Sequence, residues 1–355
     1  YKRQVSILPP ALLPSHPSHL EFPGPVTPNA PRTETNLTFN SNQTGLPREF
    51  GPANPQAMIL HSTGLYAPPG EPVTVVVPQE LVDSGVSVQV GVHDDTLWHK
   101  SKIWRFPSIV RSYPIAETQF EVGNAFGGPI FLASPPDAPL GSTWAEFRGG
   151  VEAPIYQHGS TSFSEWQIIR NRSAPWAEIS SDQFIMSVPS SEIRGLDNPE
   201  ELMDFWVEAL EMEHELYGFI PWPRIERAAF DIQISAGWMH SGYPFMAHLV
   251  SAQEAVDLEH MESEGSWGMF HELGHNHQWN PSRLPGTTET TCNFASVYLM
   301  EDLVGLDLGH SALSPQQRHQ RMESYFQGGA DIDDWSVWTA LDLSLIHISE
   351  PTRQP

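Results

Sequence analysis

The segment Trp267-Gly-Met-Phe-His271-Glu272-Leu-Gly-His275-Asn-His277 combines two histidines four residues apart with a glutamate beside the first. On a helix, residues i and i+4 lie one turn apart on the same face, so both imidazoles can reach one ion. The carboxylate of Glu272 can reach a water at the ion's open position, where zinc lowers the pKa of that water towards neutrality. The spacing therefore predicts a helix that carries two metal ligands, His271 and His275, and a general base, Glu272.

The identity of a third ligand distinguishes the known types of such sites. One type, the metzincins, requires a histidine six residues after His275, but that position is Pro281. The thermolysin-like type takes a glutamate from a following helix instead. Glu289 fits this type, because the Pro- and Gly-containing segment 280–286 ends the first helix and the threonines after it can begin another. We therefore expect Glu289 to complete a site for one Zn2+ ion per chain.

Asn293 and His277 are polar residues close to this site in the sequence. Asn293 lies one turn beyond Glu289, where it would either orient a ligating histidine or be an ordinary polar helix residue. His277 follows His275 by two residues and so points elsewhere on the helix. We expect His277 to be a surface or supporting histidine rather than a ligand.

A second candidate segment precedes the histidine helix. Residues 234–238 are placed to form an edge strand that pairs with the backbone of a substrate. We expect Trp238, His240 and Tyr243 to line the substrate-binding cleft. The alternative remains open, since aromatic residues in such a stretch often belong to the core.

The composition excludes several classes of function. The 355 residues include 43 acidic and 18 basic side chains, for a formal net charge of −25. Such a chain has little positive charge to replace counterions, and its surface as a whole would repel nucleic acid and anionic lipid, so we expect no nucleic-acid partner. No apolar run is long enough to span a membrane. The single cysteine, Cys292, excludes an intramolecular disulfide.

The sequence divides into four parts. Residues 1–50 are rich in Pro, Ser, Thr and Asn and predict a linker or disordered arm. Residues 51–165 show short alternating apolar runs, such as Val86, Val88, Val90 and Val92, which predict a β-sandwich. Residues 166–342 mix strands with helices, one of them opening at Pro199, and we assign them to a catalytic domain. The fold class is therefore α+β.

The carboxyl-terminal residues differ in character from the rest of the chain. Leu343 to Arg353 reads LSLIHISEPTR, which resembles the translation of a sequencing adapter. We expect residues 343–355 to be an artefact and to be unpacked, because Pro351 cannot continue the helix that begins near Trp335. The catalytic domain would then be truncated at its carboxyl end.

Seven segments together resemble one protein family. The runs FHELGHNHQ and GTTETTCNFASVYL resemble the enhancin and mucinase-type zinc peptidases of family M-60, a gluzincin group. Five further runs carry the resemblance over about residues 50–342: TGLYAPPGE from Thr63, GVHDDTLW from Gly91, NAFGGPIFL from Asn124, APWAE from Ala174 and ISAGWMHSGYP from Ile234.

The resemblance implies an N-terminal β-sandwich followed by a thermolysin-like zinc peptidase domain. His271, Glu272, His275 and Glu289 match the family's metal and base positions. The implied activity is hydrolysis of peptide bonds in proteins, glycoproteins or mucins. The implied alternative is a non-catalytic binding or regulatory protein of the TRP-channel-associated-factor type. We expect an extracellular or cell-surface location, with a cytoplasmic one as the alternative.

Overall fold

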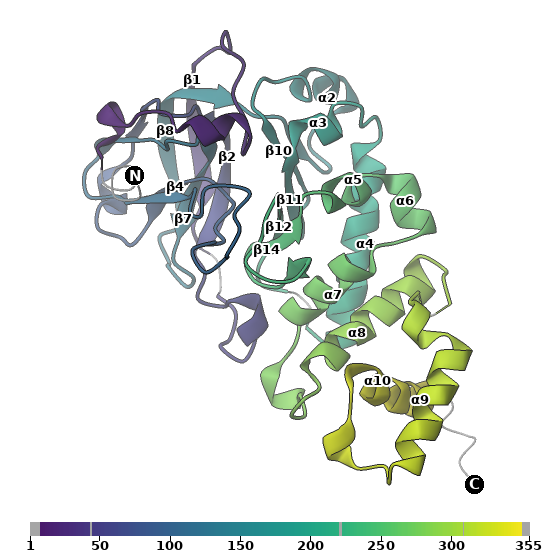
Figure 1. Ribbon diagram of the computed structural model, residues 1–355. Coiled ribbons are helices and arrows are strands. Elements are labelled where there is room, and N and C mark those ends of the chain that lie inside the picture. Colours follow the sequence, from purple (N-terminus) through teal and green to yellow (C-terminus); the bar gives the residue numbers. More distant parts are fainter. Residues whose placement is uncertain (1–7, 43–44, 220–221, 308, 350–355) are drawn as a thin grey trace.

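The computed structural model describes residues 8–42, 45–219, 222–307 and 309–349. It has a β-rich N-terminal part, a central sheet covered by helices on one side, and a helical C-terminal part (Figure 1). This order agrees with the expected α+β class.

Eight strands build the N-terminal part. They are β1 (Thr33–Asn40), β2 (Ile59–Ala67), β3 (Val73–Val76), β4 (Ser87–Val90), β5 (Arg111–Pro114), β6 (Gln119–Val122), β7 (Gly128–Ser134) and β8 (Ser142–Glu152). The strand order is β5-β4-β7-β2-β8-β3-β6, and β1 pairs with β8. The long strand β8 thus joins two halves of one sheet.

Both halves of this sheet enclose a common apolar core. Alternate residues of β3 and β4 are buried, as their period-2 patterns predict. They meet buried residues of β7 and β8, including Ile130, Leu132 and Phe147. The expected sandwich therefore takes the form of one sheet that wraps around its own core.

A second sheet forms the centre of the molecule. Its strands are β9 (Ile155–Gln157), β10 (Trp176–Ser180), β11 (Phe184–Pro189), β12 (Glu226–Asp231), β13 (Met239–His240) and β14 (Phe245–His248). The order is β13-β14-β12-β11-β10-β9, with β13 antiparallel to β14 at one edge. Among the described residues, no strand pairs with the other side of β13.

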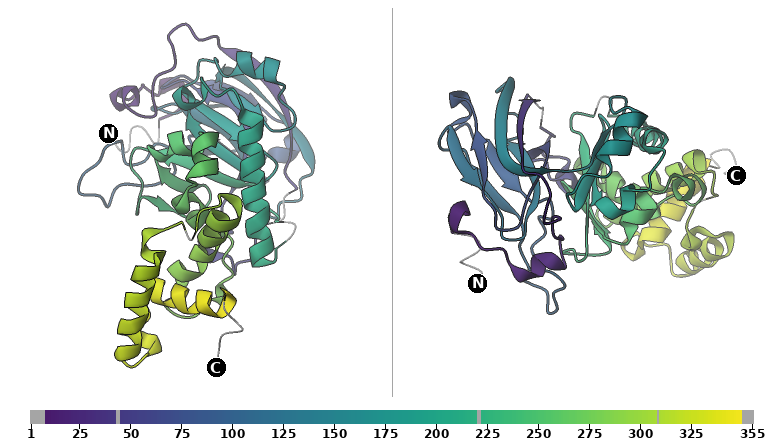
Figure 2. Two further views of the ribbon diagram at one scale, coloured as in Figure 1. Left: turned by 90° about the vertical axis from the view of Figure 1, so that its right-hand side faces the viewer. Right: turned by 90° about the horizontal axis from the view of Figure 1, so that it is seen from above.

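Helices cover one face of this second sheet and continue beyond it (Figures 1 and 2). They are α2 (Phe163–Ile169), α3 (Ser190–Ile193), α4 (Pro199–Tyr217), α5 (Ser251–Ala255), α6 (Leu258–Ser263), α7 (Trp267–Asn276), α8 (Thr288–Tyr298), α9 (Pro315–Gln327) and α10 (Val337–Ser349). The largest core lies between the sheet and helices α4 and α7, around Trp206, Phe230 and Phe270. The helix expected from Pro199 is confirmed as α4.

The opposite face of the second sheet packs on the N-terminal part. Arg105 forms an ion pair with Asp231 of β12 at 2.7 Å, and both side chains are fully buried. Arg227, also on β12, donates to the hydroxyl oxygen of Ser62 on β2 at 2.8 Å and pairs with Glu178 of β10. Buried charges of this kind hold a fixed geometry because each has its partner in place.

The expectation of a disordered arm over residues 1–50 is wrong for the described residues from 8 onwards. β1 pairs with β8 along its whole length, and Leu13 and Phe22 are buried against Tyr66 and Trp176. The proline-rich composition was misleading because these apolar anchors are widely spaced and their partners lie far away in the sequence. Residues 1–7 are outside the described part.

The expectation of an unpacked C-terminus is also wrong where the structure describes it. Helix α10 continues to Ser349, and the side chain of Leu345 is only 7% exposed. Leu345 packs with Val297, Leu313 and Leu341. The residues after 349, including Pro351, lie outside the described part. Within the described part, no helix is long and apolar enough to cross a membrane.

Candidate metal centre

Helix α7 holds the two histidines on the side that faces Glu289 of α8. Its other side carries Met269, Phe270 and Leu273, which are fully buried in the core between the helices and the second sheet. His271 and His275 lie one turn apart, with their ring centroids separated by 4.6 Å. The apolar residues therefore fix the rotation of α7 and so aim both imidazoles at one place.

Helix α8 brings the third side chain to the same place. Glu289 lies in the first turn of α8, which packs closely on α7. The close approach depends on Gly274, where a Cβ atom would lie 2.7 Å from the carbonyl oxygen of Cys292 and 3.0 Å from the Cβ of Ala295. The glycine between the two histidines is thus the contact point for the helix that supplies the carboxylate.

The three donor atoms have the spacing of a metal site. The Oε2 atom of Glu289 lies 3.2 Å from Nε2 of His271 and 3.4 Å from Nε2 of His275. Donors at tetrahedral positions about 2.0–2.2 Å from one ion are about 3.3–3.6 Å apart. Two imidazole nitrogens and one carboxylate oxygen also form a donor set of the type found at catalytic zinc sites, where a fourth position stays open. The residues present therefore fit a bound divalent ion.

Two amide side chains orient the imidazoles. Nδ1 of His271 lies 2.7 Å from Oδ1 of Asn293, and Nδ1 of His275 lies 3.0 Å from Oε1 of Gln278. Because an amide oxygen only accepts, each Nδ1 carries the proton and each Nε2 keeps its lone pair for an ion. The orienting role considered for Asn293 agrees with this contact. Gln278 was not expected, although its position three residues after His275 was visible in the sequence.

Cys292 lies beside the donor cluster but does not complete it. Its Sγ atom is 3.5 Å from both Nδ1 and Nε2 of His271. An atom equidistant from the two nitrogens cannot lie close to the lone-pair direction of one of them. Burial, together with the nearby carboxylates, raises the pKa of the Cys292 thiol far above its usual range. Cys292 is therefore a packing neighbour in this arrangement.

The electrostatics of the site keep Glu289 ionised and make Glu272 a stronger base. Hydrogen bonds from His271 and His275 hold the pKa of the Glu289 carboxyl well below its usual range. Burial raises the pKa of Glu272, against the opposing effect of the nearby histidines. A carboxylate with a raised pKa accepts a proton more readily, which suits a general base.

The structure separates the three residues expected to bind substrate. His240 lies on the edge strand β13, where its Nε2 is 2.9 Å from Oδ2 of Asp95. Trp238 is 56% exposed, and its ring stacks on His248. Tyr243 is buried between the N-terminal part and the second sheet, with the guanidinium of Arg224 over its ring. The expectation that Tyr243 lines the cleft is therefore wrong, because it is a core residue.

His277 points away from the donor cluster. Its side chain is fully buried, and Nδ1 lies 2.7 Å from Oε2 of Glu213 on α4. As expected, His277 does not point at the donor atoms. It lies in the interior, where it joins α7 to α4, and not at the surface.

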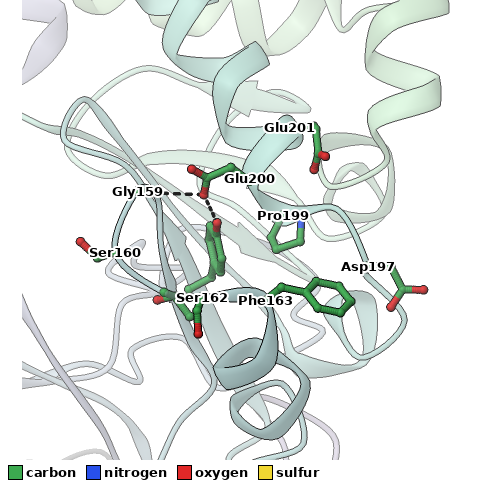
Figure 3. Close-up of a pocket in the computed structure, with 10 residues that line it drawn as sticks. Gly159, Ser160, Ser162, Phe163, Asp197, Pro199, Glu200 and Glu201 are labelled. Atoms are coloured by element: carbon green, nitrogen blue, oxygen red, sulfur yellow. Dashed lines mark hydrogen bonds between the residues drawn. The ribbon is translucent and has the colours of Figure 1, made fainter.

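A separate pocket of about 620 Å³ lies at the amino end of α4 (Figure 3). Glu200 accepts hydrogen bonds there from the hydroxyl of Tyr156 and from the backbone N–H of Gly159. The lining residues come from β9, from the turn into α2 and from the start of α4. None of these elements carries a donor of the cluster, so this pocket is distinct from the candidate metal centre.

Two family profiles match the chain. "Peptidase M60, enhancin and enhancin-like" matches residues 149–344, more than half of the chain. "N-terminal domain of M60-like peptidases" matches residues 29–143.

Curated relatives match most of the chain. TRPM8 channel-associated factor 2 of Bos taurus is 39% identical over 84% of this chain. The TRPM8 channel-associated factor homolog of Xenopus laevis is 40% identical over 84%. The chain covers 33% of each relative and so spans about a third of their length.

Solved structures share the fold at low sequence identity. A conserved protein of unknown function from Bacillus anthracis superposes with a TM-score of 0.70 at 16% identity, over 89% of this chain and 65% of that one. The catalytic domain of ZmpC from Clostridium perfringens, solved with the sialyl T antigen, gives 0.58 at 14% identity, over 75% and 57%. IMPa from Pseudomonas aeruginosa, solved with an O-glycopeptide, gives 0.57 at 15% identity, over 90% and 38%.

Proposed function

This chain belongs to the peptidase M60 family, enhancin and enhancin-like, and we propose on that premise that it is a zinc-dependent endopeptidase of the thermolysin-like, gluzincin type. The observation that carries the proposal is the meeting of three donors, His271, His275 and Glu289, beside a buried glutamate, Glu272.

His271, His275 and Glu289 would hold the zinc ion, with Asn293 and Gln278 fixing the two imidazoles. When bound, zinc polarises a carbonyl group and acidifies a water molecule at its open position. Cys292 would stay outside the coordination sphere because its sulfur lies off the Nε2 direction of His271. The site would therefore keep its fourth position open for chemistry.

Glu272 would move the protons of the reaction. Its carboxylate would accept the proton of the attacking water and later donate it to the nitrogen of the departing amine. Its burial supports this role, since it raises the pKa of the carboxyl. The free side of the edge strand β13 would bind the substrate backbone by strand addition, with His240 and Trp238 beside it.

Glycoproteins are the proposed substrate class. IMPa has been solved with an O-glycopeptide, and ZmpC with the sialyl T antigen. This chain shares their fold, and transfer of the substrate class rests on that fold and on the common family.

The second candidate function is a non-catalytic one. The relatives at 39–40% identity are named as TRPM8 channel-associated factors, which favours a binding or regulatory role. The two functions differ in one measurable respect. We expect purified chain loaded with zinc to cleave an O-glycosylated mucin, and removal of zinc by a chelator to stop cleavage. Zinc-loaded chain that leaves mucins and their deglycosylated forms intact would favour the binding role.

A further inference from the structure

A short basic and aromatic loop is exposed in this acidic protein. Residues 98–104 read WHKSKIW and connect β4 to β5 together with their flanking segments. Ile103 is 51% exposed and Trp104 is 61% exposed. We call residues 98–104 the WKW loop. In Figure 2 this dark blue segment projects from the body of the molecule.

Gln233, two residues after β12, holds the carboxyl end of the WKW loop. The backbone N–H of Trp104 donates to Oε1 of Gln233 at 2.7 Å, and Nε2 of Gln233 donates to the carbonyl of Lys102 at 2.9 Å. Directly after the loop, Arg105 forms its buried ion pair with Asp231. Near the start of the loop, Nε2 of His99 lies 3.1 Å from the carbonyl oxygen of Ser235. With contacts at both ends, the loop presents its exposed side chains with little further ordering cost.

Neighbouring residues extend the exposed apolar surface. The ring of Trp104 lies edge-on to His248, and Trp238 stacks on that same histidine at 4.5 Å. Val250, two residues after His248, is 58% exposed. Ile103, Trp104, Trp238 and Val250 thus add large exposed apolar side chains to this region. None of them lines the pocket of Figure 3.

The charge of the loop is opposite to that of the protein. The chain has only three lysines, Lys2, Lys100 and Lys102, and the structure describes the latter two, both in the WKW loop. Two carboxylates near the loop have partners, because Asp231 pairs with Arg105 and Asp95 pairs with His240. The chain as a whole carries a net charge of −25, and Glu254 is exposed one helical turn after Val250, so the attraction to anionic lipid depends on the two lysines acting within the screening length of about 8–10 Å.

We propose that the WKW loop docks this chain on the surface of an anionic lipid bilayer. Tryptophan rings prefer the boundary between headgroups and acyl chains, and lysines beside them attract anionic headgroups. A projecting loop suits insertion into a bilayer, whereas small ligands bind in concave sites. Trp238 directly precedes β13, so docking would also hold the candidate metal centre near the bilayer, a consequence that rests on the proposed function.

The test measures binding of the purified chain to vesicles by co-sedimentation. Vesicles of phosphatidylcholine are compared with vesicles that also contain about 30% phosphatidylserine. The test variants are Lys100→Ala, Lys102→Ala and Trp104→Ala. Phe163→Ala and Ile168→Ala are matched controls, since these side chains are 64% and 75% exposed on α2. Thermal unfolding of each variant shows that the fold is retained.

We expect the wild type to bind the anionic vesicles more strongly than the neutral ones. Each lysine substitution should weaken this binding about fivefold, Trp104→Ala should weaken it further, and the two controls should leave it unchanged. Equal binding to both kinds of vesicle, no binding, or equal loss in the α2 controls would overturn the proposal. Glu272→Gln removes the proposed general base but leaves the WKW loop unchanged, so this variant should bind vesicles like the wild type. Vesicle binding can therefore be judged separately from peptidase activity.

Discussion

Gly274 of α7 lies so close to Cys292 of α8 that an added Cβ would be 2.7 Å from the cysteine's carbonyl oxygen. Backbone atoms cannot give way as a flexible side chain can, so the glycine sets the distance between the two helices. Since α7 carries the histidines and α8 carries Glu289, the same contact sets the distance between the donors of the candidate metal centre.

Gly274→Ala should therefore lower the free energy of unfolding by about 1–3 kcal/mol. In an ordinary helix the same change would stabilise the chain, because alanine has the higher helix propensity. We also expect zinc affinity to fall at least about tenfold as Glu289 moves away from the histidines. Chemical denaturation and zinc titration measure the two effects. A variant as stable as the wild type with unchanged zinc affinity would show that Gly274 does not set the distance between the two helices.

Asn293→Ala should weaken zinc binding about 10–100-fold, because it removes the acceptor that holds the proton on Nδ1 of His271. Asn293→Asp keeps an acceptor at the same place and should restore most of the affinity. Competition with a fluorescent zinc chelator measures both variants. Equal affinity in the alanine and aspartate variants would contradict the orienting role.

Cys292→Ala should change zinc affinity by less than about threefold, because the sulfur lies outside the coordination sphere that we propose. Cobalt substituted for zinc offers a direct spectroscopic readout in the wild type. We expect no thiolate-to-cobalt charge-transfer band in the near-ultraviolet spectrum. Such a band, lost in Cys292→Ala, would show that the thiol is a ligand and that the site is closed.

The folded chain should lose stability as the pH falls from about 6.5 towards 4. Burial lowers the pKa of His61 and of His214 from the ordinary 6.5 to about 4. Between these values the unfolded chain binds more protons than the folded one, so the stability present above pH 6.5 decreases on acidification. Each histidine accounts for up to about 3 kcal/mol.

Thermal unfolding at several pH values measures this effect. His214→Phe should flatten the decline between pH 6.5 and 4, since its ring stacks on Trp222 and carries no proton. The exposed His319 provides the control, and His319→Gln should leave the profile unchanged. An unfolding temperature that is constant over this range would contradict the neutral state of the buried histidines.

The sequence predicted the parts of the site that follow from local geometry. The i, i+4 spacing placed His271 and His275 on one helix face, and the break at 280–286 allowed a second helix to present Glu289. The β-rich start and the helix at Pro199 also followed from local periodicity and helix-start signals.

Other features depend on contacts distant in the sequence and were not predictable in this way. Tyr243 is buried because β2 packs against it, with the backbone of Leu60 at its hydroxyl. Leu13 and Phe22 belong to a core whose other members lie beyond residue 60. Gln278 reaches His275 because its amide is held by Thr288 and Thr291 of α8. Local composition carries no information about such partners.

The central claim is that Glu272 acts as the general base of hydrolysis, whereas His271, His275 and Glu289 bind the zinc ion. The most direct test compares hydrolysis of an O-glycosylated mucin by the zinc-loaded wild type and by Glu272→Gln, with bound zinc measured in both. We expect zinc content to be equal and cleavage to fall by at least about a thousandfold in the variant. Cleavage that persists in Glu272→Gln, or a loss of zinc in parallel with the loss of cleavage, would contradict the account.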